Sequence, residues 1–216
     1  PFYGFDFKKF SNLSEVKNFS KNNFEKRYKR KPSSSEIGCS LSHYEAIKNS
    51  DISRPLIILE DDAHLKENSD VFLKLVEFIQ QTNKYEIVIF GFSKCDEISD
   101  YELNIINPFI TTLIMNDSKY SIGERLINTT SGALAYYLSP CAKKKISSLK
   151  NIFHVADDWS FYSKLGLRIG YVNPTIVIED LSQKSNLNHN EDYFRPRVLE
   201  IKFLNNFLIA KRHLIG

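Results

Sequence analysis

The stretch Leu56–Leu65 reads LIILEDDAHL and joins four aliphatic residues to three consecutive carboxylates, Glu60, Asp61 and Asp62. An unbroken aliphatic run predicts a strand that is covered on both faces, as the central strands of a parallel sheet are. Ligands of open parallel α/β sheets bind outside the carboxyl ends of the strands. We therefore expect the three acids to lie at the binding edge of an α/β sheet.

The three acids suit a divalent metal ion. Adjacent carboxylates repel one another and are costly at the rim of a core unless a cation or strong donors neutralise them. Oxygen ligands favour Mg²⁺ or Mn²⁺, which complete their coordination shell with water and substrate phosphates. Alternation along an extended chain sends Glu60 and Asp62 to one side and Asp61 to the other, towards ribose or sugar hydroxyls. The alternative is a solvated acidic turn in which the Asp residues cap the next segment.

Strand-like apolar runs alternate with helical patterns along the chain, which predicts an α/β fold and a single domain over residues 1–216. We expect a mostly parallel central sheet flanked by helices, with a βαβ unit at 55–92. Ser35 is the expected cap of a helix over 36–50, and Ser139 that of a helix over 139–149. The remaining expected elements are strands at 1–7, 109–115, 131–138 and 168–178, a short helix at 157–166 and an amphipathic helix at 195–216.

A second acidic pair, Asp157 and Asp158, begins the short helix expected at 157–166. Helix N-termini favour carboxylates, so capping is a sufficient explanation. The functional alternative is a general base, because a carboxylate within hydrogen-bond reach of an acceptor hydroxyl takes its proton as a new bond forms. His43 and His154 leave a similar choice open, between a buried structural histidine and a ligand or proton carrier.

Composition excludes several classes of protein. A formal net charge of +3 is too small to indicate nucleic-acid binding. Three cysteines without a CxxC pair argue against a disulfide framework and a structural zinc site, and favour a reducing compartment. No run approaches the roughly 20 apolar residues of a membrane span, and no signal peptide is recognisable, so we expect a cytoplasmic protein. The sequence opens at Pro1 without an initiator methionine, and we expect an N-terminal segment to precede it.

Basic residues concentrate between Lys17 and Lys31, where Glu25 is the one acid. This segment is either a solvated helix face or a site for an anionic partner. Clustered Lys and Arg near an anionic leaflet gain on the order of 1 kcal/mol each, enough for a reversible attachment to a membrane surface. The residues that would make this attachment are Lys26, Arg27, Lys29, Arg30 and Lys31.

Four stretches, taken in order, resemble glycosyltransferase family 25, which includes bacterial lipooligosaccharide galactosyltransferases and animal collagen galactosyltransferases. They are SEIGCSLSHYEAI from Ser35, PLIILEDDAHL from Pro55, SGALAYYLSPCAKKKI from Ser131 and HVADDWSFY from His154. The resemblance implies a GT-A-like fold, a UDP-hexose donor (usually UDP-galactose), a Mn²⁺ or Mg²⁺ ion and inversion at the anomeric carbon. A lipooligosaccharide or lipopolysaccharide acceptor would place the enzyme peripherally on the inner membrane of a bacterium.

The resemblance also implies roles for individual residues. Asp62 resembles the principal metal ligand, with Glu60 beside it, and Asp157 resembles the acidic residue of the last motif. Glu60, Asp61, Ser42 and His43 match positions on the donor side, and Gly132, Tyr136 and Gln183 match positions in the acceptor site or cleft. This chain differs from the family in two respects, which concern its opening and its base. The family's usual opening strand and Arg-rich turn have no counterpart before residues 1–7, and Asp158 stands where many relatives have an apolar residue, so either Asp157 or Asp158 could be the base.

Two other classes of protein could use the same strand-end acids. A metal-dependent phosphohydrolase would need a Gly-rich loop to hold phosphate, but the eight glycines form no GxxxxGK[ST] or GxGxxG motif. A non-catalytic protein of the same fold would bind the sugar nucleotide without turnover. Consumption of a nucleotide sugar with and without acceptor distinguishes these classes from a transferase.

Overall fold

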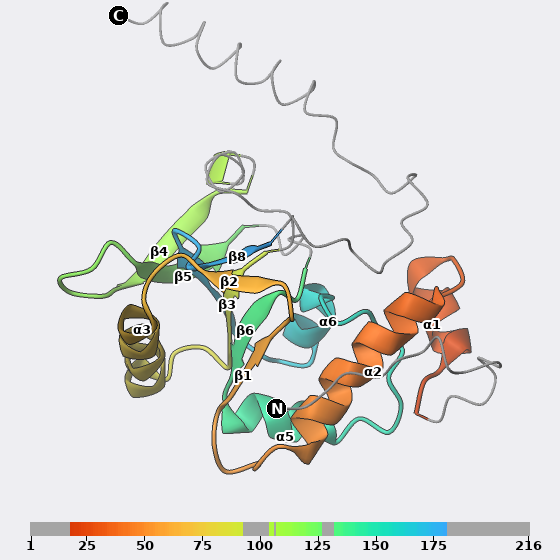
Figure 1. The fold of residues 1–216 in the computed structure, drawn as a ribbon. Helices are drawn as coiled ribbons and strands as arrows, with labels where there is room; N and C mark the ends of the chain where they lie inside the picture. The colour runs from red at the N-terminus through yellow and green to blue at the C-terminus, as the bar shows by residue number, and fades with distance from the viewer. Residues whose placement is uncertain (1–17, 93–103, 106, 127–131, 181–216) are drawn as a thin grey trace, which may run out of the picture. The chain divides into compact units, whose positions relative to one another are not determined.

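The computed structural model describes residues 18–92, 104–105, 107–126 and 132–180 (Figure 1). Their helices and strands are α1 (Lys21–Tyr28), α2 (Ser34–Asn49), β1 (Leu56–Leu59), β2 (Ala63–Leu65), α3 (Ser69–Thr82), β3 (Ile87–Gly91), β4 (Phe109–Ile114), β5 (Ser121–Arg125), β6 (Ala135–Leu138), α5 (Pro140–Ser147), α6 (Trp159–Lys164), β7 (Ile169–Asn173) and β8 (Val177–Glu179). The strand expected at 1–7, the helix expected at 195–216 and Gln183 lie outside the described residues.

Six strands form one sheet in the order β1-β6-β3-β7-β5-β4. β3 and β6 lie in its interior and are buried along their whole length, which explains their almost entirely apolar sequences, IVIFG and AYYL. β2 and β8 pair separately as a short antiparallel ribbon. The structure therefore confirms a mixed α/β fold in which helices flank a sheet.

The prediction of a mostly parallel sheet is wrong for the pairing of neighbouring strands. β3 and β7 pair in parallel, whereas the other four pairs of the sheet are antiparallel. The expected βαβ unit is only partly confirmed: α3 connects β1 to β3, but β6 lies between these two strands and runs against both. A continuous apolar run does not specify strand direction. The expectation that β1 is a central strand covered on both faces is also wrong, because β1 lies at the edge of the sheet and Leu59 is 50% exposed. Since β1 and β3 both oppose β6, they still run the same way and end at the same edge of the sheet.

Helices cover both faces of the sheet. Side chains alternate along β3, so that Ile87 and Ile89 join one hydrophobic core cluster, while Val88 and Phe90 join the other. Residues of α2, α5 and α6 complete the first cluster, and residues of α3 complete the second. Figure 1 shows α3 on the opposite side of the sheet from α2 and α5. The face covered by α2 is the one that matters for the site described below.

The N-cap residue of α2 differs from the prediction. Ser33 caps the helix in place of the expected Ser35: its Oγ accepts the Glu36 N–H at 3.2 Å, and the Glu36 carboxylate accepts the Ser33 N–H at 2.8 Å. This reciprocal pair is a capping box, which satisfies two backbone donors at once and so outweighs a cap two residues later. The expected cap Ser139 is confirmed at the start of α5.

Two strands, β2 and β5, have no counterpart among the expected elements. β2 has three residues, two of them exposed, and its chain direction is set by pairing with the distant β8. β5 mixes polar and apolar residues in the sequence SIGER and joins β4 to β7. Both strands depend on partners far away in the sequence, so local periodicity does not reveal them.

Candidate active site at the sheet edge

Glu60 follows β1 at the edge of the sheet where β3 also ends. Its N–H donates to the Leu134 carbonyl at 2.9 Å, which continues the pairing of β1 with β6 by one residue. The chain then reverses, because the Ala63 N–H donates to the Glu60 carbonyl at 3.1 Å. Glu60, Asp61 and Asp62 therefore lie in a turn beside the start of β6.

His43 connects α2 to this edge. Its Nδ1 lies 2.7 Å from the hydroxyl of Tyr136 on β6, and its Nε2 lies 3.3 Å from Glu60 Oε1. Tyr136 is fully buried and packs edge-on against Trp159 with ring centroids 5.3 Å apart. Burial holds the pKa of the Tyr136 phenol well above its usual range, so the hydroxyl keeps its proton. Three predicted site residues thus form a continuous polar chain from β6 through α2 to the end of β1.

Asp157 reaches the same edge from the loop before α6. One of its carboxylate oxygens, Oδ2, accepts the Gly132 N–H at 2.6 Å. Gly132 has a φ of 98°, a conformation that glycine adopts without a steric penalty and that exposes its N–H to the carboxylate. Burial raises the pKa of Asp157, the Gly132 hydrogen bond opposes that shift, and the nearby Glu60 charge adds to it. Asp157 and Gly132 were predicted from separate motifs and are in direct contact.

Asp158 has a different environment from its neighbour. Its side chain is 7% exposed and accepts hydrogen bonds from Arg27 (2.5 and 2.8 Å), from the Tyr28 hydroxyl and from the Phe161 N–H (3.0 Å). Burial alone would raise its pKa, but these donors lower the pKa to about 2. Asp158 is also the N-cap of α6. The carboxylate therefore ties α1 to α6, and its lone pairs are engaged by donors from the protein.

Asp62 combines a buried carboxylate oxygen with negative neighbours. Among the described residues its Oδ1 has no hydrogen-bond partner although it is buried. Burial raises the pKa of Asp62, and the charges of Glu60 and Glu179 raise it further. Glu179 lies opposite Ala63 in the β2–β8 ribbon and was not predicted as a site residue, because the ribbon that places it there was not predicted either. An unpartnered oxygen among carboxylates fits a hard cation such as Mg²⁺ or Mn²⁺.

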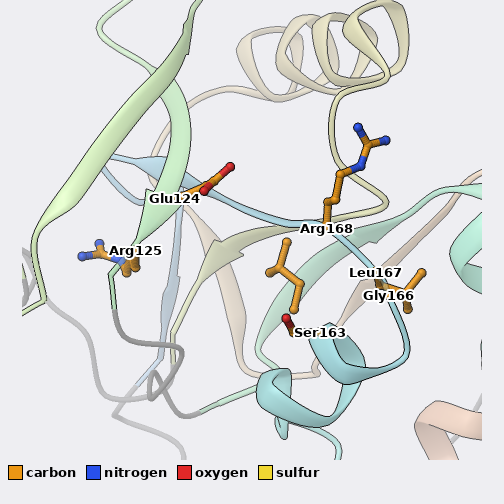
Figure 2. Close-up of a pocket in the computed structure, with 7 residues that line it drawn as sticks. Glu124, Arg125, Ser163, Gly166, Leu167 and Arg168 are labelled. Atoms are coloured by element: carbon orange, nitrogen blue, oxygen red, sulfur yellow. The ribbon is translucent and has the colours of Figure 1, made fainter.

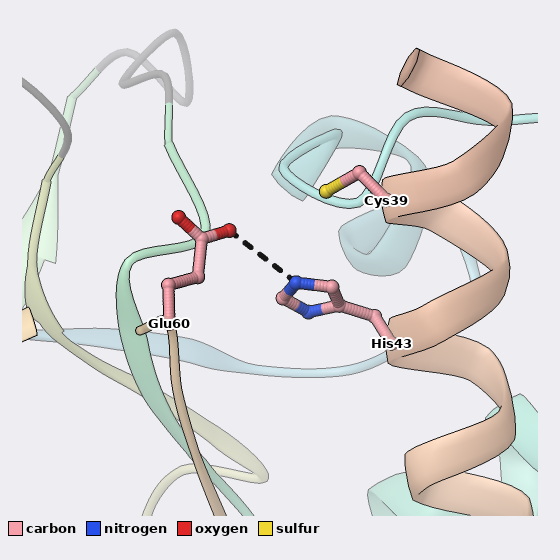
Figure 3. A group of neighbouring side chains, drawn as sticks. All are labelled: Cys39, His43 and Glu60. Carbon is pink, nitrogen blue, oxygen red and sulfur yellow. Dashed lines mark ion pairs between the residues drawn. The ribbon is translucent and has the colours of Figure 1, made fainter. Parts of the chain in front are cut away.

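Sequence reasoning also missed Cys39, which lies one turn before His43 on α2. One ligand atom from each of Cys39, His43 and Glu60 lies within 4.8 Å of the other two (Figure 3). Burial raises the pKa of the Cys39 thiol to about 12, and the charges of Glu60 and Asp157 contribute. A Cys followed by a His four residues later on a helix was the signal that could have revealed this cluster.

The other predicted residues are less closely tied to the edge. Asp61 is exposed in the turn, and Ser42 is partly buried on α2 beside His43. His154 is buried and stacks on Phe161 with ring centroids 4.1 Å apart, and burial lowers its pKa. These surroundings are those of a neutral structural histidine.

The basic segment is partly engaged inside the protein. Arg27 binds Asp158, and Arg30 forms a two-pronged ion pair with Glu36, which completes the capping box of α2. Lys26, Lys29 and Lys31 are exposed. The predicted patch therefore retains three lysines whose charges face solvent.

A pocket of about 350 Å³ lies at the other end of the sheet (Figure 2). Its lining comes from the end of β5, the end of α6, the residues after α6 and the start of β7, and includes Glu124, Arg125, Ser163 and Arg168. Because β7 runs parallel to β3, its start is remote from the edge where Glu60 lies. None of the predicted site residues lines this pocket.

The model of glycosyltransferase family 25 (LPS biosynthesis protein) matches residues 2–160. This match contains the predicted site residues except Gln183, and Glu179 also lies outside it. A comparison with curated proteins finds no match. Within the described residues, no helix combines the length and apolar character needed to cross a membrane. Since the family match covers well over half of the 216 residues, the chain belongs to glycosyltransferase family 25.

Proposed function

We propose that this protein is an inverting galactosyltransferase that moves galactose from UDP-galactose to a hydroxyl of a lipooligosaccharide or lipopolysaccharide acceptor. The observation that supports this proposal is the meeting at one sheet edge of Glu60, Asp62 and the Gly132–Asp157 pair. A transferase needs a cation site for the departing nucleotide and a base for the acceptor, and these residues offer both. In this proposal the sheet and its helices form a GT-A-like nucleotide-sugar-binding fold.

Asp157 acts as the general base. The Gly132 N–H fixes the orientation of its carboxylate, and burial raises its pKa, which makes the carboxylate a stronger proton acceptor than an exposed Asp. It takes the proton of the acceptor hydroxyl as that oxygen attacks the anomeric carbon from the face opposite UDP. The anomeric centre is thereby inverted, by the stereochemical reasoning that applies to single displacements in glycosidases.

Asp62 would hold Mn²⁺ or Mg²⁺, with Glu60 beside it. When bound, the ion neutralises the charge that develops on the departing UDP. Glu60, Asp61, Ser42 and His43 serve the donor side in this assignment, and Gly132, Tyr136 and Gln183 serve the acceptor or cleft. Tyr136 positions His43 through its hydroxyl, and His43 in turn positions the Glu60 carboxylate.

We place the enzyme on the cytoplasmic face of the inner membrane, where its lipid-linked acceptor would be made. Lys26, Lys29 and Lys31 are exposed on and just after α1 and provide a positive surface for anionic lipids. Arg27 and Arg30 support this surface indirectly, because their ion pairs attach α1 to α6 and α2.

A panel of UDP-sugars tests the proposed reaction with the full-length protein, with and without a lipooligosaccharide acceptor and with Mn²⁺ present or chelated. We expect release of UDP that requires both acceptor and Mn²⁺ and is fastest with UDP-galactose. Release of UMP or phosphate without acceptor would indicate a phosphohydrolase instead. Binding of a UDP-sugar without any turnover across a range of acceptors would indicate a non-catalytic binding protein.

A further inference from the structure

Cys39, His43 and Glu60 form a cluster of three possible metal ligands, in which Cys39 has no part in the proposed transfer reaction. Cys39 and His43 are four residues apart on α2, a spacing that puts both side chains on one face of the helix. Figure 3 shows both side chains directed from α2 towards Glu60, which comes from the end of β1. Their ligand atoms all lie within 4.8 Å of one another.

The separation of these atoms fits a tetrahedral ion. Two ligands that each lie about 2.0 Å from a tetrahedral zinc are about 3.3 Å apart. His43 Nε2 and Glu60 Oε1 are 3.3 Å apart. A thiolate and an imidazole nitrogen on the same zinc are about 3.5 Å apart, and Cys39 Sγ lies within 4.8 Å of both other ligand atoms.

The ring of His43 is already oriented for metal binding. Its Nδ1 lies 2.7 Å from the hydroxyl of Tyr136, and a proton on Nδ1 donated to that oxygen leaves the Nε2 lone pair directed at the cluster. Tyr136 cannot move easily, because it is fully buried in β6 and packed against Trp159. Metal-binding histidines typically have such a second hydrogen bond, which fixes the tautomer and the ring.

We propose that Cys39, His43 and Glu60 bind Zn²⁺, at a site separate from the carboxylate oxygens around Asp62. A thiolate and an imidazole prefer Zn²⁺ to Mg²⁺ or Mn²⁺, whereas carboxylates alone prefer the harder ions. Binding converts the Cys39 thiol to a thiolate and releases its proton to solvent, and a water molecule completes the tetrahedron. The sequence spacing of the three cysteines argued against a structural zinc site, but this site uses one cysteine together with ligands of two other types.

The proposed site has a consequence for transfer, and this consequence alone depends on the proposed function. Glu60 is both a ligand of the Zn²⁺ site and a residue of the donor edge. An ion held by Cys39 and His43 withdraws Glu60 from Asp62, so Zn²⁺ should inhibit transfer even with Mn²⁺ in excess.

Titration of the metal-free full-length protein with Co²⁺ and Zn²⁺ tests the site directly. Co²⁺ should produce a thiolate-to-cobalt absorption band, and one equivalent of Zn²⁺ should abolish it. Cys39→Ser should remove the band and weaken Zn²⁺ binding by at least about tenfold. Cys141→Ser is the matched control, since Cys141 is an exposed thiol on α5 outside the cluster, and it should keep both the band and the affinity.

A second variant keeps the test decisive if Cys39→Ser disturbs α2. Glu60→Gln preserves shape and leaves the helix unchanged, and it should weaken Zn²⁺ binding while retaining the thiolate band. Parent-like Zn²⁺ affinity in both Cys39→Ser and Glu60→Gln would overturn the proposal. In the transfer assay Zn²⁺ should inhibit the parent, whereas Cys39→Ser should turn over normally in Mn²⁺ and resist Zn²⁺. A protein that binds Zn²⁺ through Cys39 but transfers no sugar would refute the proposed function and support the proposed zinc site.

Discussion

Asp157 and Asp158 are adjacent acids with opposite electrostatic environments. Asp157 has a raised pKa because it is buried with one backbone donor, and Asp158 has a pKa of about 2 because an arginine, a tyrosine and a backbone N–H donate to it. Two neighbouring carboxylates with such different surroundings are suited to different tasks. These surroundings suit Asp157 to the proposed role of proton acceptor and Asp158 to that of a structural anion.

Replacement of Asp158 by Asn should reveal its structural task in the pH dependence of stability. The folded pKa, about 2, lies below the ordinary value of 3.8, so the carboxylate stabilises the fold above pH 3.8 and loses this effect as pH falls towards about 2. Asp158→Asn should therefore lower the free energy of unfolding at pH 7 by ~2 kcal/mol, with a smaller difference from the parent below pH 3.8.

Urea unfolding of parent and variant at several pH values measures this difference. Asp117→Asn is the matched control, because Asp117 is exposed and has a φ of 57°, which Asn tolerates well. Equal stability of Asp158→Asn and the parent at pH 7 would show that the Arg27 and Tyr28 contacts contribute nothing net.

Asp62 should bind the hard metal ion through Oδ1, which is buried and has no hydrogen-bond partner in the part of the chain that the structure describes. A ligand that binds the folded state stabilises it by about 2.7 kcal/mol at a concentration of 100 times its dissociation constant. Mn²⁺ should thus raise the melting temperature of the parent, and Asp62→Asn should lose most of this increase without unfolding in chelator. An undiminished Mn²⁺ effect in the variant, measured by calorimetry, would refute Asp62 as the ligand.

At the scale of elements, α2 carries both Cys39 and His43, so its first turn helps to fix the site. Loss of an N-cap side chain costs about 1 kcal/mol, and Ser33→Ala should lower the free energy of unfolding by that amount because Ser33 forms the capping box with Glu36. Ser35→Ala serves as the control and should have a much smaller effect. A larger loss for Ser35→Ala than for Ser33→Ala in urea unfolding would contradict the observed start of the helix.

At the scale of elements, the exposed lysines on and just after α1 should contact the membrane. Joint replacement of Lys26, Lys29 and Lys31 by Gln removes three exposed charges and leaves the ion pairs of Arg27 and Arg30 in place. We expect weaker cosedimentation with vesicles that contain anionic lipid, and we expect binding of the parent to fade as salt rises.

A control with the same change in charge replaces the exposed Lys48, Lys144 and Lys150, which lie on or after other helices. If both triple variants lose the same amount of vesicle binding, net charge alone accounts for the effect. If neither loses any, the lysines near α1 form a solvated face.

At the scale of the whole molecule, the sequence predicted most elements and much of the edge. The apolar runs of β3 and β6 are strong signals because these strands are buried along their whole length. β1 is an edge strand with Leu59 half exposed, but Glu60 lies at its end as expected. The contact between Gly132 and Asp157 could not be predicted from either motif alone, although both residues were named. Long-range pairing brings these motifs together, and no local pattern encodes that pairing.

Strand direction and the ion-pair partners of the charged side chains could not be predicted from the sequence, for similar reasons. An antiparallel β6 between β1 and β3 leaves the same apolar pattern as a parallel neighbour. The ion pair of Arg27 with Asp158 joins residues 131 positions apart, so the sequence left the identity of the base open. The structure separates the two acids by what each contacts.

Donor binding and turnover of Asp157→Asn, measured together with UDP-galactose, Mn²⁺ and acceptor, test most directly whether the sheet edge is a transferase active site. Loss of a general base lowers kcat by roughly 10²–10⁴-fold, whereas donor affinity should stay within about twofold of the parent because Asp157 acts on the acceptor hydroxyl. Asp117→Asn should match the parent in both quantities. A variant that retains parent-like kcat, or one that loses donor binding in proportion to kcat, would contradict the role of Asp157 as the base.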